Sequence, residues 1–307
     1  MKRGQQKEKT AKLIISIISL MLLFFVISGQ AQCPGQQTQA SKTGLDFYLD
    51  NSQDFLYEGK QIYQGETFNV GIIVENYDRV SRSGRICIRD DISDSFLGIS
   101  SSGEGDCQIF NVKAAEETEQ KSGALGGTQK TIIPGKTEIF FPANGQYKYL
   151  GLPSVNYYNG RLFVSAFYRQ TTRATTTLVL PGNDQPKLEQ QPAPIFLSLY
   201  QSTHKRDNNY QTDLTLTLTK QPSAKIFSND FLRENVTYFN AEVTPQQLYC
   251  YNKNGEQITN FLELTNENII KCSFLIPSTS AQSYPFVLTL DYGVEIPKQY
   301  NFQIRTN

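Results

Sequence analysis

The densest group of residues that could do chemistry is a run of carboxylates between Cys87 and Cys107. Its members are Asp90, Asp91, Asp94, Glu104 and Asp106. Several oxygen ligands close together in the sequence suit Ca²⁺. The spacing is not that of an EF-hand, because the sixth residue counted from Asp90 is Ser95 instead of Gly and the twelfth is Ser101 instead of Glu. The cluster therefore predicts either a calcium loop or a solvated loop that a disulfide braces.

No catalytic constellation is visible in the sequence. The single histidine, His204, lies in the polar run 202–209. A Ser-His-Asp or Cys-His system needs a histidine held beside a carboxylate and facing a nucleophile. A glycosidase needs two carboxylates that face each other across a cleft, and these can be far apart in the sequence. We predict a protein that is not an enzyme and has no catalytic residues, with a secreted carbohydrate-active or other hydrolytic enzyme as the alternative.

Five cysteines in an exported chain indicate two disulfides and one leftover thiol. The simplest pairing joins Cys87 to Cys107 and Cys250 to Cys272, so that each bridge closes a loop of about 20 residues. In the chain-entropy model a loop of that size contributes about 3 kcal/mol to the free energy of unfolding. Cys33 is left over. No CxxC motif or zinc-ligand cluster is present, so the paired cysteines are predicted to be structural.

The first 31 residues have the pattern of an export segment. A basic head precedes the apolar run 13–27, and the small-residue exit 28–31 follows it. As a helix the apolar run is about 22 Å long, which is short for a bilayer core of about 30 Å. Cleavage before Gln32 is therefore favoured. The uncharged continuation to residue 41 leaves an uncleaved membrane anchor as the alternative, and in both cases the body lies outside.

Composition divides the rest of the chain into two domains. The Gln-rich stretch 32–43 cannot build a core and is predicted to be a flexible tether. A second break, 181–194, has four prolines and few apolar residues, as in a semi-rigid spacer. The predicted order is a signal or anchor (1–31), a tether (32–43), a first domain (44–182), a Pro-rich linker (183–192) and a second domain (193–307).

Hydrophobic residues alternate with a period of two in both domains, which predicts half-buried strands. The pattern is clear at 68–74, 214–218, 286–290 and 300–304, and segments 161–168 and 172–180 are rich in strand-forming residues. The one candidate for a short helix is 112–120. Many short strands separated by turn residues indicate an all-β fold, which we expect to be two tandem immunoglobulin-like antiparallel β-sandwiches after the N-terminal signal or anchor helix.

One segment resembles a known family. Residues 64–77 read QGETFNVGIIVENY, in which a Gly-containing turn leads into alternating apolar positions that end in Glu-Asn. This layout resembles the early strand of CARDB-like immunoglobulin-type domains of prokaryotic surface proteins, where the pattern G-x-x-F-x-V-x-V-x-V-x-N-x-G recurs. Tyr77-Asp78 stands where that family has a Gly after the Asn. The resemblance implies an extracellular adhesion or stalk module without catalytic residues.

The net charge of the chain and its glycosylation sequon indicate which kinds of partner and modification to expect. The whole chain has a net charge of zero, and its first 31 residues carry five basic and one acidic residue, so the body is near −4. Such a balance does not favour nucleic acid as a partner. The single N-x-S/T sequon, at Asn235, is a candidate glycosylation site.

These signals together predict an exported, non-enzymatic cell-surface protein with a structural, adhesion or partner-binding role. Its partner would be a protein or a component of the cell envelope, and it would touch a membrane through residues 13–31 if the leader is not cleaved. A calcium-dependent adhesion module is a further alternative, in which Ca²⁺ would be the only cofactor.

Overall fold

The computed structural model describes residues 44–122, 127–152, 156–191, 193–222, 224–265, 267–277 and 282–306, without the side chains of 120–130. The predicted signal or anchor, the tether and Cys33 lie outside these residues. Within the described ranges, no helix has the length and apolar character needed to cross a membrane.

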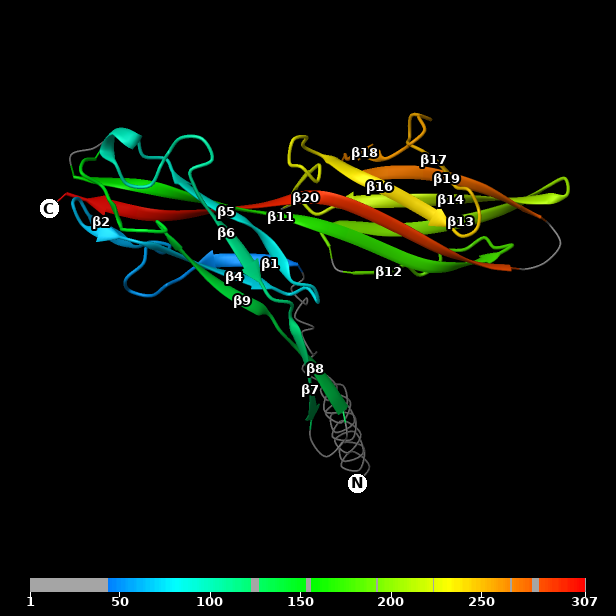
Figure 1. Cartoon of the computed structure of the whole chain (residues 1–307), viewed down its shortest axis with the longest axis horizontal. Coiled ribbons are helices and arrows are strands. Elements are labelled where there is room, and N and C mark those ends of the chain that lie inside the picture. The colour runs from blue at the N-terminus through cyan, green and yellow to red at the C-terminus, as the bar shows by residue number, and fades with distance from the viewer. Residues whose placement is uncertain are drawn as a thin grey trace, which may run out of the picture. The chain divides into compact units, whose positions relative to one another are not determined.

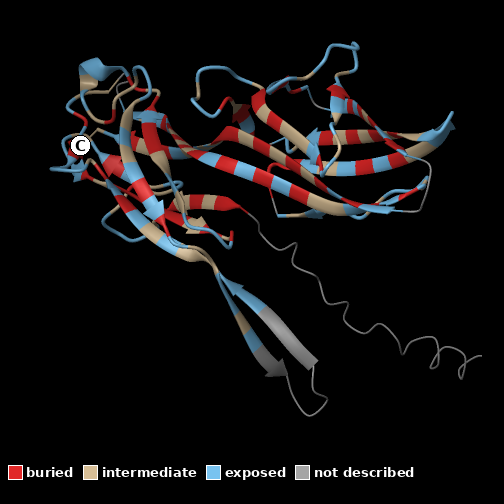
Figure 2. Ribbon diagram, turned by 45° about the vertical axis from the view of Figure 1, so that its right-hand side comes forward, coloured by how far each residue is buried: buried red, intermediate tan, exposed pale blue. Residues whose placement is uncertain are grey.

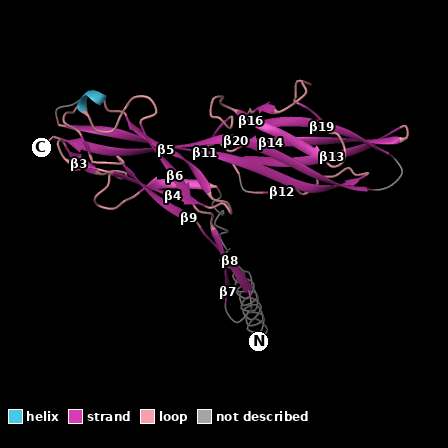
Figure 3. Cartoon of the chain, viewed as in Figure 1, coloured by secondary structure: helices cyan, strands magenta, loops and turns pink. Residues whose placement is uncertain are grey.

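The fold is all-β, as the alternating pattern predicts. Apart from one 3-10 turn, η1 (Asp94–Phe96), every regular element of the described residues is a strand (Figure 3). The pairings between these strands are antiparallel in all cases but one, the short parallel pairing of β2 (Gln61–Tyr63) with β20 (Gln282–Arg305). The helix expected at 112–120 is wrong. Its residues end β6 (Asp106–Val112) and begin the hairpin of β7 (Glu116–Ser122) with β8 (Gly127–Ile133), because cross-strand pairing outweighs the helix propensity of Ala and Glu.

A nine-stranded sheet organises the chain (Figure 1). Its two longest strands, β11 (Tyr157–Leu180) and β20, pair along their full 24 residues, from Tyr157 opposite Arg305 to Leu180 opposite Gln282. The strand order is β18-β16-β20-β11-β5-β6, and β2, β12 and β15 pair at its sides. The remaining strands of this sheet are β5 (Arg82–Asp90), β12 (Glu189–Gln190), β15 (Lys225–Phe227), β16 (Val236–Val243) and β18 (Phe261–Glu263).

Two smaller sheets supply further strands of the core. One has the order β1-β4-β9 and the other β13-β14-β19-β17, and β3 pairs with β10 as a separate short ladder. Their bounds are β1 (Leu45–Leu49), β3 (Thr67–Phe68), β4 (Val70–Asn76), β9 (Gly135–Phe141), β10 (Tyr147–Lys148), β13 (Ile195–Arg206), β14 (Asn209–Lys220), β17 (Tyr249–Tyr251) and β19 (Glu267–Pro277). Most buried apolar residues of these sheets belong to one continuous cluster.

The long pairing of β11 with β20 joins a strand of the predicted domain 44–182 to a strand of the predicted domain 193–307, and the division into these domains stays a prediction. The described residues form one compact unit. From Gly293 onward, β20 pairs with residues 157–169 of β11, beside β5, and so lies in the half of the sheet to which the first part of the chain contributes. The Pro-rich segment supplies β12, which pairs with Ala174 and Thr175 of β11.

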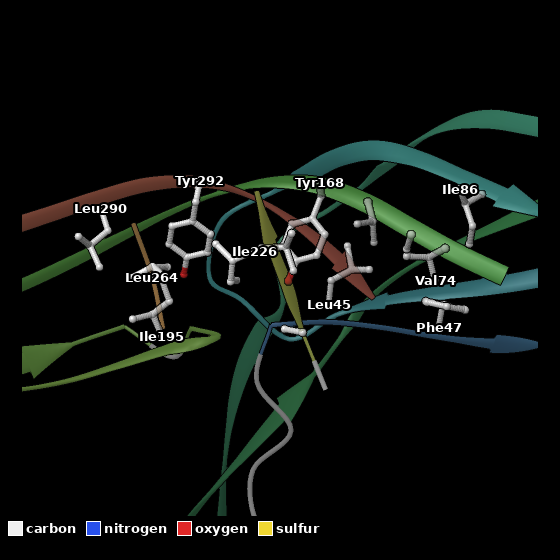
Figure 4. Packing of buried hydrophobic residues seen from close by; sticks show 14 of the residues in the cluster. Leu45, Phe47, Val74, Ile86, Tyr168, Ile195, Ile226, Leu264, Leu290 and Tyr292 are labelled. Carbon is white, nitrogen blue, oxygen red and sulfur yellow. The ribbon is translucent and has the colours of Figure 1, made fainter. Parts of the chain in front are cut away.

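Alternation along the two long strands sets which residues are buried (Figure 2). The even-numbered residues of β11 from Gly160 to Leu180 are buried almost without exception, while the odd-numbered ones face outward. Near the middle of the ladder the inner face carries Tyr168 and Tyr292, and Figure 4 shows both rings on the same side of the sheet. The Tyr292 hydroxyl lies 2.7 Å from the Oγ1 of Thr172, and burial raises the pKa of Tyr292, so the phenol stays neutral.

Both predicted disulfides are confirmed. Cys87 of β5 bonds to Cys107 of β6, and Cys250 of β17 bonds to Cys272 of β19. In each case the two cysteines stand directly opposite each other on antiparallel neighbours, with sequence separations of 20 and 22 residues. The bridges therefore tie together adjacent strands within a sheet.

The Thr172–Tyr292 hydrogen bond gives a test of how the centre of the ladder is held. Tyr292→Phe leaves the buried Thr172 hydroxyl without that partner, so we expect the free energy of unfolding to fall by about 1–2 kcal/mol. Thr172→Val in the same chain removes the orphaned hydroxyl, so the double variant should be less destabilised than the sum of the two single variants. Denaturant unfolding of the four proteins measures this coupling; strict additivity would contradict it.

Candidate binding site on the outer sheet face

The five carboxylates singled out in the sequence do not meet at one point. Arg161 contacts Asp91 through its backbone N–H and its Nε, each at 2.8 Å, and Arg85 makes a two-pronged ion pair with Glu104. The Tyr147 hydroxyl donates to Asp106. Among the described residues, the one group of three candidate metal-ligand atoms joins a carboxylate to Cys87 and Cys107, whose sulfurs already form a disulfide. The carboxylates of the cluster are therefore held by different side chains and do not converge on one point.

Two members of that cluster organise the loop between β5 and β6. Asp94 accepts bonds from the Ser101 N–H at 2.7 Å and the Ser101 hydroxyl at 3.1 Å, and these bonds lower the pKa of its carboxyl. Asp90 is buried, and it accepts the Tyr149 hydroxyl and, at 3.0 Å, the Ile92 N–H. Burial raises the pKa of Asp90 to about 7, although both hydrogen bonds act in the opposite direction. Asp90 is therefore a buried residue whose hydrogen bonds hold the loop after β5 and the Tyr149 side chain.

The remaining predicted positions lie apart from one another. His204 is exposed on β13, where its Nε2 lies 2.9 Å from the Ser202 hydroxyl. Asn235 has a left-handed backbone with φ of 56°, and its Oδ1 accepts a bond from Lys220 at 2.9 Å. Thr237 of the sequon is fully buried and donates to the backbone. Glycosylation of Asn235 remains a prediction.

The outer face of the nine-stranded sheet carries arginines beside phenylalanines. Alternation on β11 turns Arg161, Phe163 and Phe167 outward, next to Arg85 and Arg89 of β5. The Arg89 guanidinium lies 4.8 Å from the centroid of the Phe163 ring, and that of Arg161 lies 5.7 Å from it. Arg85 lies 4.8 Å from the Phe167 ring. We call these five residues the arginine–phenylalanine row; its contacts are cation–π interactions, worth about 0.5–1 kcal/mol each at exposed sites.

A tight turn at residues 228–235 projects over the same face. The Asp230 carboxylate accepts bonds from the Ser228 hydroxyl and, at 3.1 Å, the Leu232 N–H. The Ser228 hydroxyl in turn accepts the Arg233 N–H at 2.9 Å, and the backbones of Ser228 and Arg233 pair at 2.7 Å. The side-chain bonds of an Asx turn therefore fix the backbone of this loop.

Phe231 anchors the loop to the sheet. It has a left-handed backbone with φ of 62°, which is uncommon for a bulky residue. Its ring packs between Phe167 and Phe227, with centroids 6.1 Å away in each case. The ring also lies against Gly293 of β20, where an added Cβ would stand 2.6 Å from it. A glycine at position 293 is therefore required for the ring to reach the sheet.

The loop and four strands border an open hollow of about 420 Å³, which we call the outer hollow. Arg169 of β11, Asp291 of β20, Tyr238 of β16 and Phe261 of β18 form its floor and walls. Ser228, Asn229, Asp230 and Arg233 close it from the loop. Its size falls in the range of small-molecule sites. Arg169 stands on the same face of β11 as the arginine–phenylalanine row, so the two features are continuous.

Opposite charges and aromatic rings line the outer hollow. The Arg233 guanidinium stacks 4.8 Å from the Phe261 ring, and Tyr238 meets Phe261 edge-on at 6.1 Å. Arg169 donates from its Nε to the Asn229 carbonyl at 3.1 Å. The Ser228 and Leu232 hydrogen bonds lower the pKa of Asp230, so this carboxylate is ionised at neutral pH. The hollow thus offers both donors and acceptors beside apolar rings.

Sequence reasoning missed the outer hollow. One usable signal is the shared parity of Arg161, Arg169 and Arg173, which places three arginines on one face of a single strand. The sequence gives no comparable signal for Tyr238 or Phe261, because their approach to Arg169 depends on the strand order of the sheet.

Comparison with known proteins adds little. No protein-family description matches the chain, and neither does any curated protein. Among solved structures, the chain is similar to the C-terminal domain of the Streptococcus agalactiae AgI/II polypeptide BspA, with 8% identity and a TM-score of 0.17, over 85% of this chain and 100% of that one. A TM-score this low carries no argument about function.

Asp90 makes a pH-dependent contribution to stability. Its pKa is about 7 in the folded protein and about 3.8 as the reference for the unfolded chain, so the native state binds a proton first as the pH falls. Stability from this group is greatest below pH 4 and is lost as the pH rises through 7. Asp90→Asn removes this titration. Relative to wild type, the free energy of unfolding of the variant should therefore rise by up to about 4 kcal/mol as the pH increases from 4 to 8. Urea unfolding across that range measures it; an unchanged pH profile would contradict the assignment.

The contact of Phe231 with Gly293 can be tested by substitution. Gly293→Ala forces the ring away from the sheet, and we expect a loss of about 1–3 kcal/mol in the free energy of unfolding. In a Phe231→Ala background the ring atoms nearest to the added methyl group are gone, so the added cost should fall to a small fraction of that value. Equal costs in both backgrounds would show that the ring does not depend on the glycine.

Proposed function

We propose that this chain is an exported binding module, without enzymatic activity, that engages a protein or cell-envelope partner through the outer face of its central sheet. The observation that carries the proposal is the arginine–phenylalanine row and its continuation into the outer hollow. Arginine and aromatic side chains are enriched at protein interfaces and dominate their binding free energy. Strands hold these side chains in fixed rows, which lowers the entropy lost on binding.

Location outside the cell fits the chemistry of the chain. Two disulfides between neighbouring strands suit an oxidising compartment. The export segment predicted at residues 1–31 would deliver the body there, either released or held by an uncleaved leader. The two halves would act as immunoglobulin-like modules of the adhesion or stalk type, in line with the resemblance of residues 64–77 to CARDB-like domains.

The enzymatic alternative has one point in its favour, since Asp230 and Asp291 both line the outer hollow. A glycosidase acid must hold its proton near neutral pH, which requires a raised pKa. Hydrogen bonds lower the pKa of Asp230 instead, and Asp291 accepts the Thr171 hydroxyl at 2.6 Å. These partners suit recognition better than proton transfer. The calcium-dependent alternative has less support, because the acidic residues predicted for it each have protein partners.

The proposal predicts saturable binding of the purified exported protein to the envelope fraction of the cells that make it. Replacing both Arg85 and Arg89 with Ala should weaken that binding by about 30-fold or more, because even one hot-spot arginine contributes about 2 kcal/mol or more. The matched control replaces the exposed Lys187 and Lys253 with Ala, which removes the same charge elsewhere. Unsaturable binding, or equal losses in both double variants with unchanged thermal stability, would contradict the proposal.

A further inference from the structure

The outer hollow combines charged groups of both signs with aromatic rings. Its two guanidinium groups, on Arg169 and Arg233, come from different elements, and two carboxylates, on Asp230 and Asp291, stand with them. An aromatic wall of Tyr238 and Phe261 lies at one side. The formal charges of these groups balance, so the hollow as a whole is close to neutral.

The balance of two positive and two negative charges limits which chemical classes of ligand can bind in the outer hollow. A polyanion such as a nucleic acid or a phosphate cluster would meet both carboxylates and be repelled by them. A purely apolar ligand would displace water from four charged groups and offer them no hydrogen bond in return, at a high cost in free energy. A ligand with one carboxylate and several hydroxyl groups satisfies every group, because guanidinium pairs with carboxylate in a two-pronged geometry and aspartate accepts hydroxyl donors.

The aromatic wall fits the same ligand. The C–H faces of a sugar ring are apolar and pack on aromatic side chains, while the ring's hydroxyl groups point sideways toward polar groups. Phe261 is 55% exposed and so keeps a large accessible surface although Arg233 stacks on it. A peptide carboxylate would use the arginines but would leave the acceptors with fewer hydroxyl donors.

The loop holds this arrangement in place before a ligand arrives. Asp230 fixes the turn through the Ser228 hydroxyl and the Leu232 N–H, and Phe231 anchors it on Gly293. Arg169 ties the strand to the loop through the Asn229 carbonyl. A left-handed conformation at a bulky residue costs free energy, and such strain is concentrated at binding sites. Pre-organisation of this kind lowers the entropic cost of binding a small ligand.

We infer that the outer hollow is a binding site for an acidic saccharide, a sugar that carries one carboxylate, with Arg169 and Arg233 as the carboxylate ligands and Asp230 and Asp291 as hydroxyl acceptors. The inference rests on the proposed function, since it names the chemistry that the binding face would recognise. The ligand would be a terminal or exposed uronic or sialic acid residue of a surface glycan, held against Tyr238 and Phe261.

The experiment compares sugars that differ only in the carboxylate. Methyl glucuronide and methyl glucoside share a ring and differ in having a carboxylate or a hydroxymethyl group, and the methyl glycoside of N-acetylneuraminic acid is a second acidic probe. Titration calorimetry on the exported protein should show at least one acidic probe binding about tenfold or more tightly than the glucoside, as the loss of a charge-assisted pair predicts.

Variants locate the site. Arg169→Gln and Arg233→Gln should each lower the affinity for the acidic probe by about tenfold. Arg173 is an exposed arginine on the same face of β11 but outside the hollow, so Arg173→Gln should leave the affinity for the acidic probe unchanged. Thermal unfolding of each variant shows whether the fold is kept, and for a variant that does not fold the conservative Arg→Lys change replaces it in the same titration.

Either of two results overturns the inference: neither acidic probe binds, or binding is unaffected by Arg169→Gln and Arg233→Gln. The binding of wild-type protein and of the Arg85 and Arg89 double variant to the envelope fraction is measured in parallel. If envelope binding persists in the wild-type protein and is lost in the double variant, only the saccharide inference has failed and the proposed function stands. If it is also absent, the proposed function has failed with it.

Discussion

The structure depends on the uninterrupted pairing of β11 with β20. Twenty-four residues of each strand face each other in one register, which fixes the direction of every side chain along both strands. A shift of one residue would exchange the two faces, so Leu162 would meet solvent and Arg161 would enter the core. Burial of the inner face, including Tyr168 and Tyr292, therefore specifies the register, and the register in turn places the outer arginines.

The candidate site inherits its geometry from the same ladder. Arg169 and Asp291 stand close on the outer face because Arg169 is paired with Gly293, two residues further along β20. The missing side chain at Gly293 admits the Phe231 ring, and this ring brings the 228–235 loop down to the sheet. Hydrogen bonds within the loop then set the position of Arg233. Packing, register and local turn chemistry thus build one surface, and this is the surface that the proposed binding function uses.

Part of this could be predicted from the sequence. Period-two alternation correctly gave the all-β class, and the even division of four cysteines between the halves gave both disulfides. The length of β20 could not be foreseen, because Pro285, Pro297 and the buried Glu295 interrupt its pattern and made 286–290 and 300–304 look like separate strands. Glu295 is accommodated by Lys225 at 3.3 Å and the Ser165 hydroxyl at 3.0 Å, contacts that come from distant segments. Likewise the carboxylates near Asp90 are neighbours in sequence, but strand alternation and the turn after β5 direct them to different partners.

Amide hydrogen exchange under native conditions tests most directly whether the long ladder unites the two halves of the body. We predict that the slowest-exchanging amides lie along β11 and β20 on both sides of Tyr168 and Tyr292, and that added denaturant abolishes their protection at one common free energy. Two groups of amides that open at different free energies, divided near Arg169 and Gly293, would contradict it and would show two domains that unfold independently.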